Sequence, residues 1–134
     1  MSDDWLAAAE GVSDGARAAW REVVTCPLPE GFSRELTSKG FIAHDLRFRR
    51  GEDWMFSAVL NEGWVLWYVR RPAIRGGLVE PQAMLARFPD ARLKPDGELA
   101  LRLHDGAAAA ALTGWCLPAC RRVPRRDAGE GIKC

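Results

Sequence analysis

The chain of 134 residues has little of the material from which most catalytic sites are built. It contains one tyrosine and two histidines, His44 and His104. Neither histidine has a serine or cysteine at a recognisable catalytic spacing, and no pair of carboxylates stands out that could act as acid and base. The sequence therefore assigns no catalytic residue, and we expect a protein that is not an enzyme and that holds no cofactor.

Long hydrophobic runs are also missing. No segment approaches the ~18 consecutive apolar residues that a membrane span needs. The start, Met1-Ser-Asp-Asp-Trp5, is acidic and unlike a secretory signal peptide. We therefore expect a cytoplasmic protein with no membrane partner.

Cysteine is too sparse and too irregularly spaced for a metal site or a disulfide framework. The four cysteines are Cys26, Cys116, Cys120 and Cys134. Cys116 and Cys120 are one residue further apart than the usual close metal pair, and no second pair or nearby histidine completes four ligands. We expect free thiols and no bound metal, with Cys26 and Cys116 as small core residues.

Lysine is scarce as well, with three lysines against sixteen arginines. Together with many alanines and glycines, this ratio is typical of a GC-rich genome. The formal net charge of +1 hides an uneven distribution, because residues 121–134 hold five basic and two acidic side chains. We predict one domain over residues 1–120 and a mobile basic tail over residues 121–134.

What the chain does contain is a run of aromatic and β-branched residues from Phe41 to Arg71. It divides into three strands, Phe41–Phe48, Trp54–Leu60 and Trp64–Val69, joined by turns at Arg50–Asp53 and Asn61–Gly63. Short glycine-bearing connections between such segments are typical of an antiparallel meander.

Side chains alternate between the two faces of a strand, so the pairing predicts which residues share a face. We place Leu60 opposite Trp64 and Arg49 opposite Trp54. The predicted core face then carries Ile42, His44, Leu46, Phe48, Met55, Ser57, Val59, Val65, Trp67 and Val69. The other face carries Asp45, Arg47, Arg49, Trp54, Phe56, Ala58, Leu60, Trp64, Leu66, Tyr68 and Arg70.

Helices are predicted on both sides of this meander. Acidic residues after Ser2 favour a short helix over Trp5–Glu10. A second helix begins at Ser13-Asp14, with Ala16, Ala19, Trp20, Val23 and Val24 on one apolar stripe. Asp105 is expected to cap a last helix from Ala107 to about Trp115.

Local signals assign the remaining segments. Phe32–Lys39 fits either a helix turn or a strand, and we favour a first strand. Arg70–Gly77 shows no periodicity and is interpreted as a flexible loop. Pro81 opens a short helix to Phe88. Pro95-Asp-Gly97 predicts a hairpin turn between Ala91–Lys94 and Glu98–Leu103, with Leu99, Leu101 and Leu103 on one face and Ala100 and Arg102 on the other.

These elements predict an α+β fold, in which N-terminal and C-terminal helices pack on an antiparallel meander sheet of about five strands. The segment Gly51–Val59, the strand Leu66–Val69, Pro72 and the Pro81–Phe88 helix resemble the MmcQ/YjbR-like proteins. That resemblance implies a small bacterial α+β domain of loosely defined role, for which DNA binding has been proposed.

The arginine-rimmed aromatic face is the best candidate for a functional surface. Aromatic planes beside guanidinium groups can hold a ligand by stacking and by charge. The candidate ligand-binding residues are Trp54, Trp64, Tyr68, Arg47 and Arg70. We expect a small ligand or a protein partner there, a homodimer included, unless another helix covers the face.

Weak nucleic-acid binding is the alternative, since arginines beside aromatic planes also suit phosphates and bases. Its candidate residues are Arg47, Arg49, Arg70 and Arg71 with the tail residues Arg121, Arg122, Arg125 and Arg126.

Overall fold

The computed structural model describes residues 6, 9, 11–39 and 42–118. Its strands are β1 (Phe32–Lys39), β2 (Ile42–Arg50), β3 (Asp53–Leu60), β4 (Val65–Val69), β5 (Arg92–Leu93) and β6 (Leu99–Leu103). Its helices are α2 (Asp14–Thr25), α3 (Arg71–Arg75), α4 (Pro81–Arg87) and α5 (Gly106–Cys116). The α+β class is confirmed, with six antiparallel strands where about five were expected.

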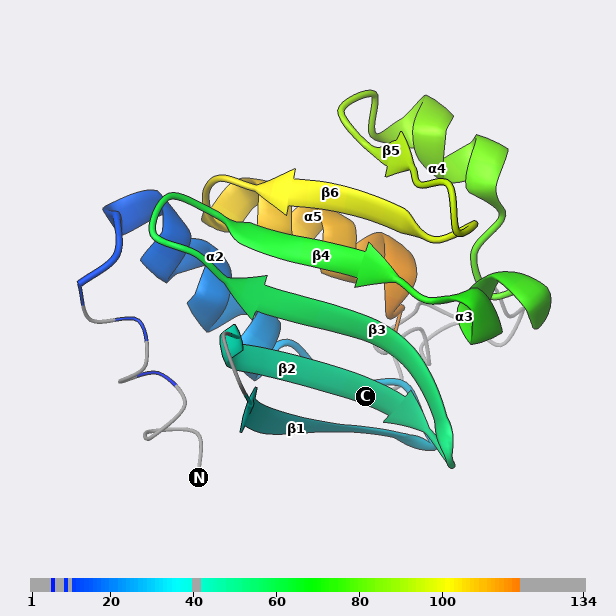
Figure 1. Cartoon of the computed structure of the whole chain (residues 1–134), viewed down its shortest axis with the longest axis horizontal. Helices are drawn as coiled ribbons and strands as arrows, with labels where there is room; N and C mark the ends of the chain where they lie inside the picture. Colours follow the sequence, from blue (N-terminus) through cyan, green and yellow to red (C-terminus); the bar gives the residue numbers. More distant parts are fainter. Residues whose placement is uncertain (1–5, 7–8, 10, 40–41, 119–134) are drawn as a thin grey trace, which may run out of the picture.

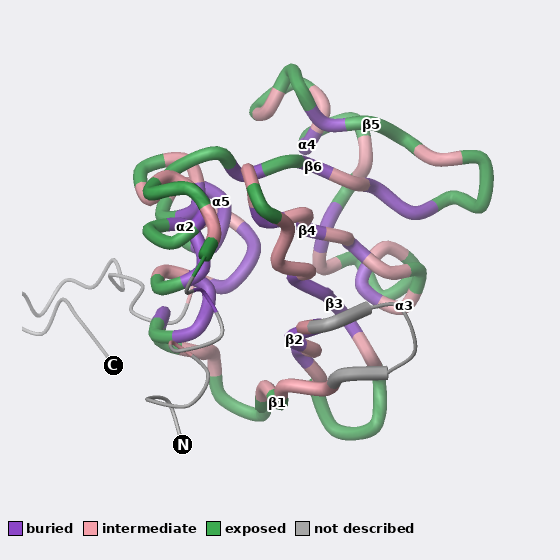
Figure 2. The backbone as a smooth tube through the Cα atoms, turned by 60° about the vertical axis from the view of Figure 1, so that its left-hand side comes forward, coloured by how far each residue is buried: buried purple, intermediate pink, exposed green. Residues whose placement is uncertain are grey.

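The strands form one sheet in the order β1-β2-β3-β4-β6-β5. Helices α2 and α5 lie side by side behind this sheet in the view of Figure 1, and Figure 2 shows the same two layers from another side. Helices α3 and α4 lie at one end of the sheet, near β3 and β5 (Figure 1). No described helix therefore lies over the face of the sheet that points to the viewer in Figure 1.

Helix α2 forms where its sequence predicts it. The side chain of Ser13 accepts a hydrogen bond from the backbone N–H of Ala16 and caps the helix. All five residues of the predicted stripe, Ala16, Ala19, Trp20, Val23 and Val24, are buried. The apolar stripe thus fixes which side of the helix faces the sheet and α5.

Two glycines allow close contact around the start of α2. A Cβ atom added at Gly15 would lie 2.1 Å from the backbone oxygen of His104, and one added at Gly106 would lie 3.3 Å from Cβ of Ala18. The backbone N–H of Ser13 also donates to the carbonyl oxygen of Glu62 at 2.8 Å. The start of α2 therefore packs against the end of β6 and against the β3–β4 loop.

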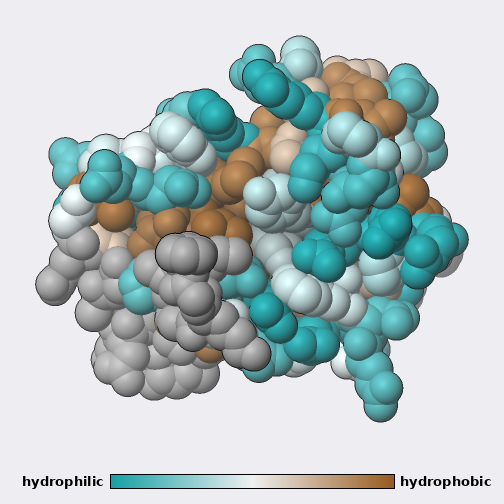
Figure 3. Space-filling view, viewed as in Figure 1, coloured by the Kyte–Doolittle hydropathy of each residue, from teal (hydrophilic) through white to brown (hydrophobic). Residues whose placement is uncertain are grey.

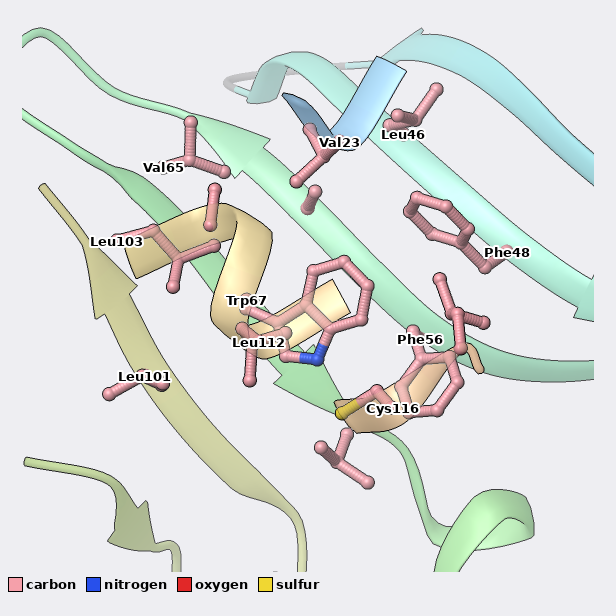
Figure 4. Close-up of a cluster of buried hydrophobic side chains, with 14 of the residues drawn as sticks. Val23, Leu46, Phe48, Phe56, Val65, Trp67, Leu101, Leu103, Leu112 and Cys116 are labelled. Atoms are coloured by element: carbon pink, nitrogen blue, oxygen red, sulfur yellow. The ribbon is translucent and has the colours of Figure 1, made fainter. Parts of the chain in front are cut away.

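Trp67 is at the centre of the core (Figure 4). Its ring centroid lies 5.1 Å from that of Phe48 and 5.2 Å from that of Phe56. Trp20 from the predicted stripe of α2 is also fully buried and belongs to the same core as Trp67. Offset and tilted aromatic pairs of this kind add to the free energy that burial alone supplies.

The predicted faces of β3 are wrong from Phe56 onward. Phe56 and Ala58 point into the core, whereas Ser57 lies on the other face opposite Tyr68. Leu60 is likewise on the core face and Val59 on the other, because Leu60 pairs with Val65 and not with Trp64. A shift of one residue in pairing moves a whole strand to the opposite face.

A β-bulge in β3 explains why the predicted faces are wrong in this strand and not in its neighbours. Arg49 does pair with Trp54, as predicted, but Phe48 pairs with Phe56, which leaves Met55 as an extra residue in β3. The faces predicted for β2 and β4 are therefore correct at the described side chains: Leu46, Phe48, Val65, Trp67 and Val69 are buried. His44 is only partly buried, and the side chain of Ile42 lies outside the described residues.

The loop predicted over Arg70–Gly77 is wrong, because α3 occupies Arg71–Arg75 with Pro72 in its first turn. One helical turn is too short to show a periodic pattern. The predicted strand at Phe32–Lys39, the Pro95–Gly97 hairpin, and the helices at Pro81 and after Asp105 are all confirmed. The helix expected over Trp5–Glu10 and the tail 121–134 lie outside the described residues, apart from Leu6 and Ala9.

Candidate ligand-binding face

We use the term open face for the side of the sheet opposite α2 and α5. Strand pairing arranges its side chains in rows that cross the strands from β1 towards β5. One row is Thr37, Asp45, Val59, Leu66 and Arg102. The next row is Glu35, Arg47, Ser57, Tyr68, Ala100 and Arg92. Trp54, Trp64 and Arg70 lie on the same side, and Figure 3 shows apolar side chains gathered among hydrophilic ones on this face.

Three arginines of the open face are paired with acids. Arg47 Nε lies 3.4 Å from Asp45 Oδ2, and Arg49 Nε lies 3.0 Å from Glu35 Oε1. Arg70 Nε lies 3.1 Å from Oε2 of Glu98, which is a buried residue. Their charges are therefore largely neutralised within the protein.

Trp54 is held between two of these arginines. The guanidinium carbon of Arg47 lies 4.0 Å from the Trp54 ring centroid and that of Arg70 lies 3.8 Å from it. The indole N–H donates to Oγ of Ser57 at 2.7 Å. Two guanidinium groups thus contact the ring and its one donor is bonded, which makes Trp54 a structural centre of the open face.

A hollow lies beside this cluster, over β4, β6 and β5. Its volume is about 570 Å³, and its apolar and aromatic lining comes from Trp64, Leu66, Tyr68 and Ala100. Ala100 sits between Tyr68 on β4 and Arg92 on β5 in the row across the sheet. Because its side chain is a single methyl group, the taller residues around it form walls.

Cationic side chains line these walls and contact the aromatic rings. Arg102 lies 4.3 Å from the Trp64 ring centroid, and Nζ of Lys94 lies 4.8 Å from that of Tyr68. Arg92 and His104 also line the hollow and are exposed. The rings thereby fix cationic groups at the edge of an apolar floor.

These cations are neutralised less than Arg47, Arg49 and Arg70 are. Lys94 forms an ion pair of 3.6 Å with Asp96, whose pKa is lowered by a hydrogen bond from the Glu98 backbone N–H and by Lys94 itself. Within the described part of the chain, neither Arg92 nor Arg102 forms an ion pair. Asp90 is the acid among the described lining residues. The hollow therefore carries a local positive charge.

The structure divides the predicted ligand-binding residues into two groups. Trp64 and Tyr68 line the hollow, whereas Trp54, Arg47 and Arg70 form the neighbouring neutralised cluster. Arg71 is exposed at the start of α3, and Arg121, Arg122, Arg125 and Arg126 lie outside the described residues. Sequence reasoning did not select Arg92, Lys94, Ala100 or Arg102, although the alternation of Leu99–Leu103 already placed Ala100 and Arg102 away from the core.

The described cysteines are buried and unsuited to chemistry. Burial is the main cause that raises the pKa of both Cys26 and Cys116, although the nearby Arg34 partly opposes it at Cys26. In Figure 4 the Trp67 indole nitrogen lies beside the Cys116 sulfur. Among the described residues no three histidine, cysteine or acidic side chains are grouped as a metal would require.

No described helix combines the length and the apolar character needed to cross a membrane. Comparison with known proteins adds no assignment, since no protein family, no curated protein and no solved structure matches this chain.

Proposed function

We propose that this protein is a small, non-enzymatic binding domain whose ligand site is the hollow in the open face. The observation that carries the proposal is the combination of Trp64, Tyr68, Leu66 and Ala100 with cations at their edge. Pockets for small molecules commonly measure roughly 300–1,000 Å³ and join an apolar lining to a few polar groups. A hollow of about 570 Å³ is therefore matched to a small molecule.

Nucleic-acid binding at the sheet is the weaker hypothesis. Phosphate binding needs cations that are free to replace counterions. Arg47, Arg49 and Arg70 already have carboxylate partners, and Arg47 and Arg70 enclose the one aromatic ring between them. A nucleic acid would depend on Arg71 and the tail residues.

A cytoplasmic location belongs to the same proposal. Its support is the pair of buried free thiols, Cys26 and Cys116, which suits a reducing compartment. Membership of the MmcQ/YjbR-like proteins, and with it a bacterial origin, likewise stays a hypothesis from the sequence resemblance.

A fragment screen observed by ¹H–¹⁵N NMR tests the proposed site. We expect fragment binding to change the amide chemical shifts most at and around Trp64, Tyr68 and Arg102. Ala100→Met should abolish these changes, because a longer side chain would fill the floor of the hollow. Ala110→Met is the matched control, since Ala110 is exposed on α5 behind the sheet. Shifts that centre elsewhere, or that survive Ala100→Met, would contradict the proposal.

A further inference from the structure

We infer that the hollow selects small organic anions with a flat apolar body, such as aromatic carboxylates. This inference rests on the proposed function, because it names the class of ligand for the same hollow. It follows from three features of the lining: which cations are free, how they are held in place, and what lies between them.

The free cations are Arg92 and Arg102, on adjacent strands. Arg92 is opposite Ala100, and Arg102 follows Ala100 by two residues on the same face of β6. Both side chains therefore start next to the same small residue. A guanidinium group presents two parallel N–H donors to a carboxylate, which favours this anion over a neutral group.

One of these cations is already positioned before a ligand arrives. Arg102 rests on the Trp64 ring at 4.3 Å, opposite Leu66 in the strand pairing. An arginine held against a ring loses less conformational entropy on binding than one that moves freely in solvent. Lys94, on the Tyr68 ring, adds positive charge at the other wall, although Asp96 partly neutralises it.

The floor between the cations is apolar. Leu66 and Ala100 form it, and their neighbours Trp64 and Tyr68 limit its length. A flat ring system placed on this floor would put an acidic substituent next to Arg92 or Arg102. The opposing acid among the described lining residues is Asp90, whose repulsion of an anion is set against the attraction of Arg92, Arg102 and Lys94.

The charges of the rest of the open face sharpen this selection. Outside the hollow, Arg49, Arg47 and Arg70 are paired with Glu35, Asp45 and Glu98, so these arginines offer no competing anion site. An anion is therefore attracted to the hollow in preference to the Trp54 cluster. A cationic group on a ligand would be repelled by Arg92, Lys94 and Arg102.

Three probes with one ring system test the selection: 2-naphthoate, 2-naphthalenemethanol and 2-naphthylmethylammonium. Their dissociation constants are measured by calorimetry at neutral pH with the full chain. We expect 2-naphthoate to bind about tenfold or more tightly than the alcohol, since hydrogen bonds to charged groups are the stronger ones. The ammonium probe should bind more weakly than the alcohol.

Two double variants separate local charge from overall charge. Arg92→Gln with Arg102→Gln should reduce the preference for naphthoate over the alcohol to about twofold or less, while the alcohol binds as before. Arg21→Gln with Arg75→Gln removes the same charge from exposed sites on α2 and α3 and should leave the preference unchanged.

The outcomes distinguish this inference from the proposed function. If the alcohol and naphthoate bind equally and Ala100→Met abolishes both, the hollow is a ligand site and the anion selection is wrong. An equal loss of preference in the Arg21/Arg75 control would also overturn the selection. If none of the probes binds the native protein, the proposed function itself fails.

Discussion

At the scale of single residues, the environment of each polar group decides whether it is available for binding. Arg102 and Arg70 both rest on tryptophan rings, at 4.3 Å and 3.8 Å, and lie on the same face of the sheet. Arg70 has a buried carboxylate beside it, whereas Arg102 has none among the described residues. The same residue type is therefore a structural group in one place and a candidate ligand contact in the other.

The buried thiols give a prediction at this scale. A raised pKa keeps a cysteine in its thiol form, and the thiolate is the form that reacts. We expect Cys26 and Cys116 to resist iodoacetamide at pH 8 in the native protein and to react fully in denaturant, as measured by mass spectrometry of peptides. Rapid native labelling of Cys116 would show that its part of the core opens readily.

At the scale of elements, the contact between α2 and the end of β6 depends on the absence of a side chain at Gly15. Gly15→Ala should lower the free energy of unfolding by several kcal/mol, because its Cβ would lie 2.1 Å from the His104 oxygen and the backbone would have to move. Gly114→Ala is the control: nothing lies within 4 Å of its Cβ, and the helix should gain about 0.5–1 kcal/mol.

Urea denaturation of both variants measures these changes. The two substitutions add the same methyl group to helices that lie side by side, so their difference reports the local contact and not helix propensity. Equal midpoints for Gly15→Ala and the unmodified protein would contradict the close packing of α2 against β6.

The elements that could be predicted from sequence are those specified by neighbouring residues. The stripe of α2 and the Pro95–Gly97 hairpin need only local periodicity and turn chemistry, and both were predicted correctly. The faces of β3 could not be predicted, because they depend on a bulge at Met55 and on the pairing of Leu60 with Val65. Such a choice of register is decided by packing against other strands.

The hollow could not be predicted from the sequence, for a related reason. Alternation along Leu99–Leu103 placed Ala100 and Arg102 on one face, but it could not show that β6 pairs with β4. That pairing brings Ala100 beside Tyr68 and Arg102 beside Leu66, from segments well separated in the chain. Trp64 and Tyr68 could be selected from their aromatic chemistry alone, whereas the cations around them required the sheet order.

At the scale of the whole molecule, α2 and α5 cover one side of the sheet, and the cations of the other side fall into a neutralised group and an unpaired group. Ion pairs neutralise Arg47, Arg49 and Arg70, and two arginines without acidic partners among the described residues, Arg92 and Arg102, remain at the hollow. An apolar surface patch rimmed by polar groups commonly marks an interaction site. The hollow is where these features coincide, and it therefore forms the central claim.

The most direct test of that claim is to locate a bound probe by NMR in protein labelled at its alanine methyl groups. With 2-naphthoate bound, we expect nuclear Overhauser effects between the naphthalene protons and the Ala100 methyl group, and none to the Ala110 methyl group on α5. Ala100 lies in the floor of the hollow, so this contact is required if the ring occupies it. Contacts only to alanines of the helices, with none to Ala100, would contradict the account.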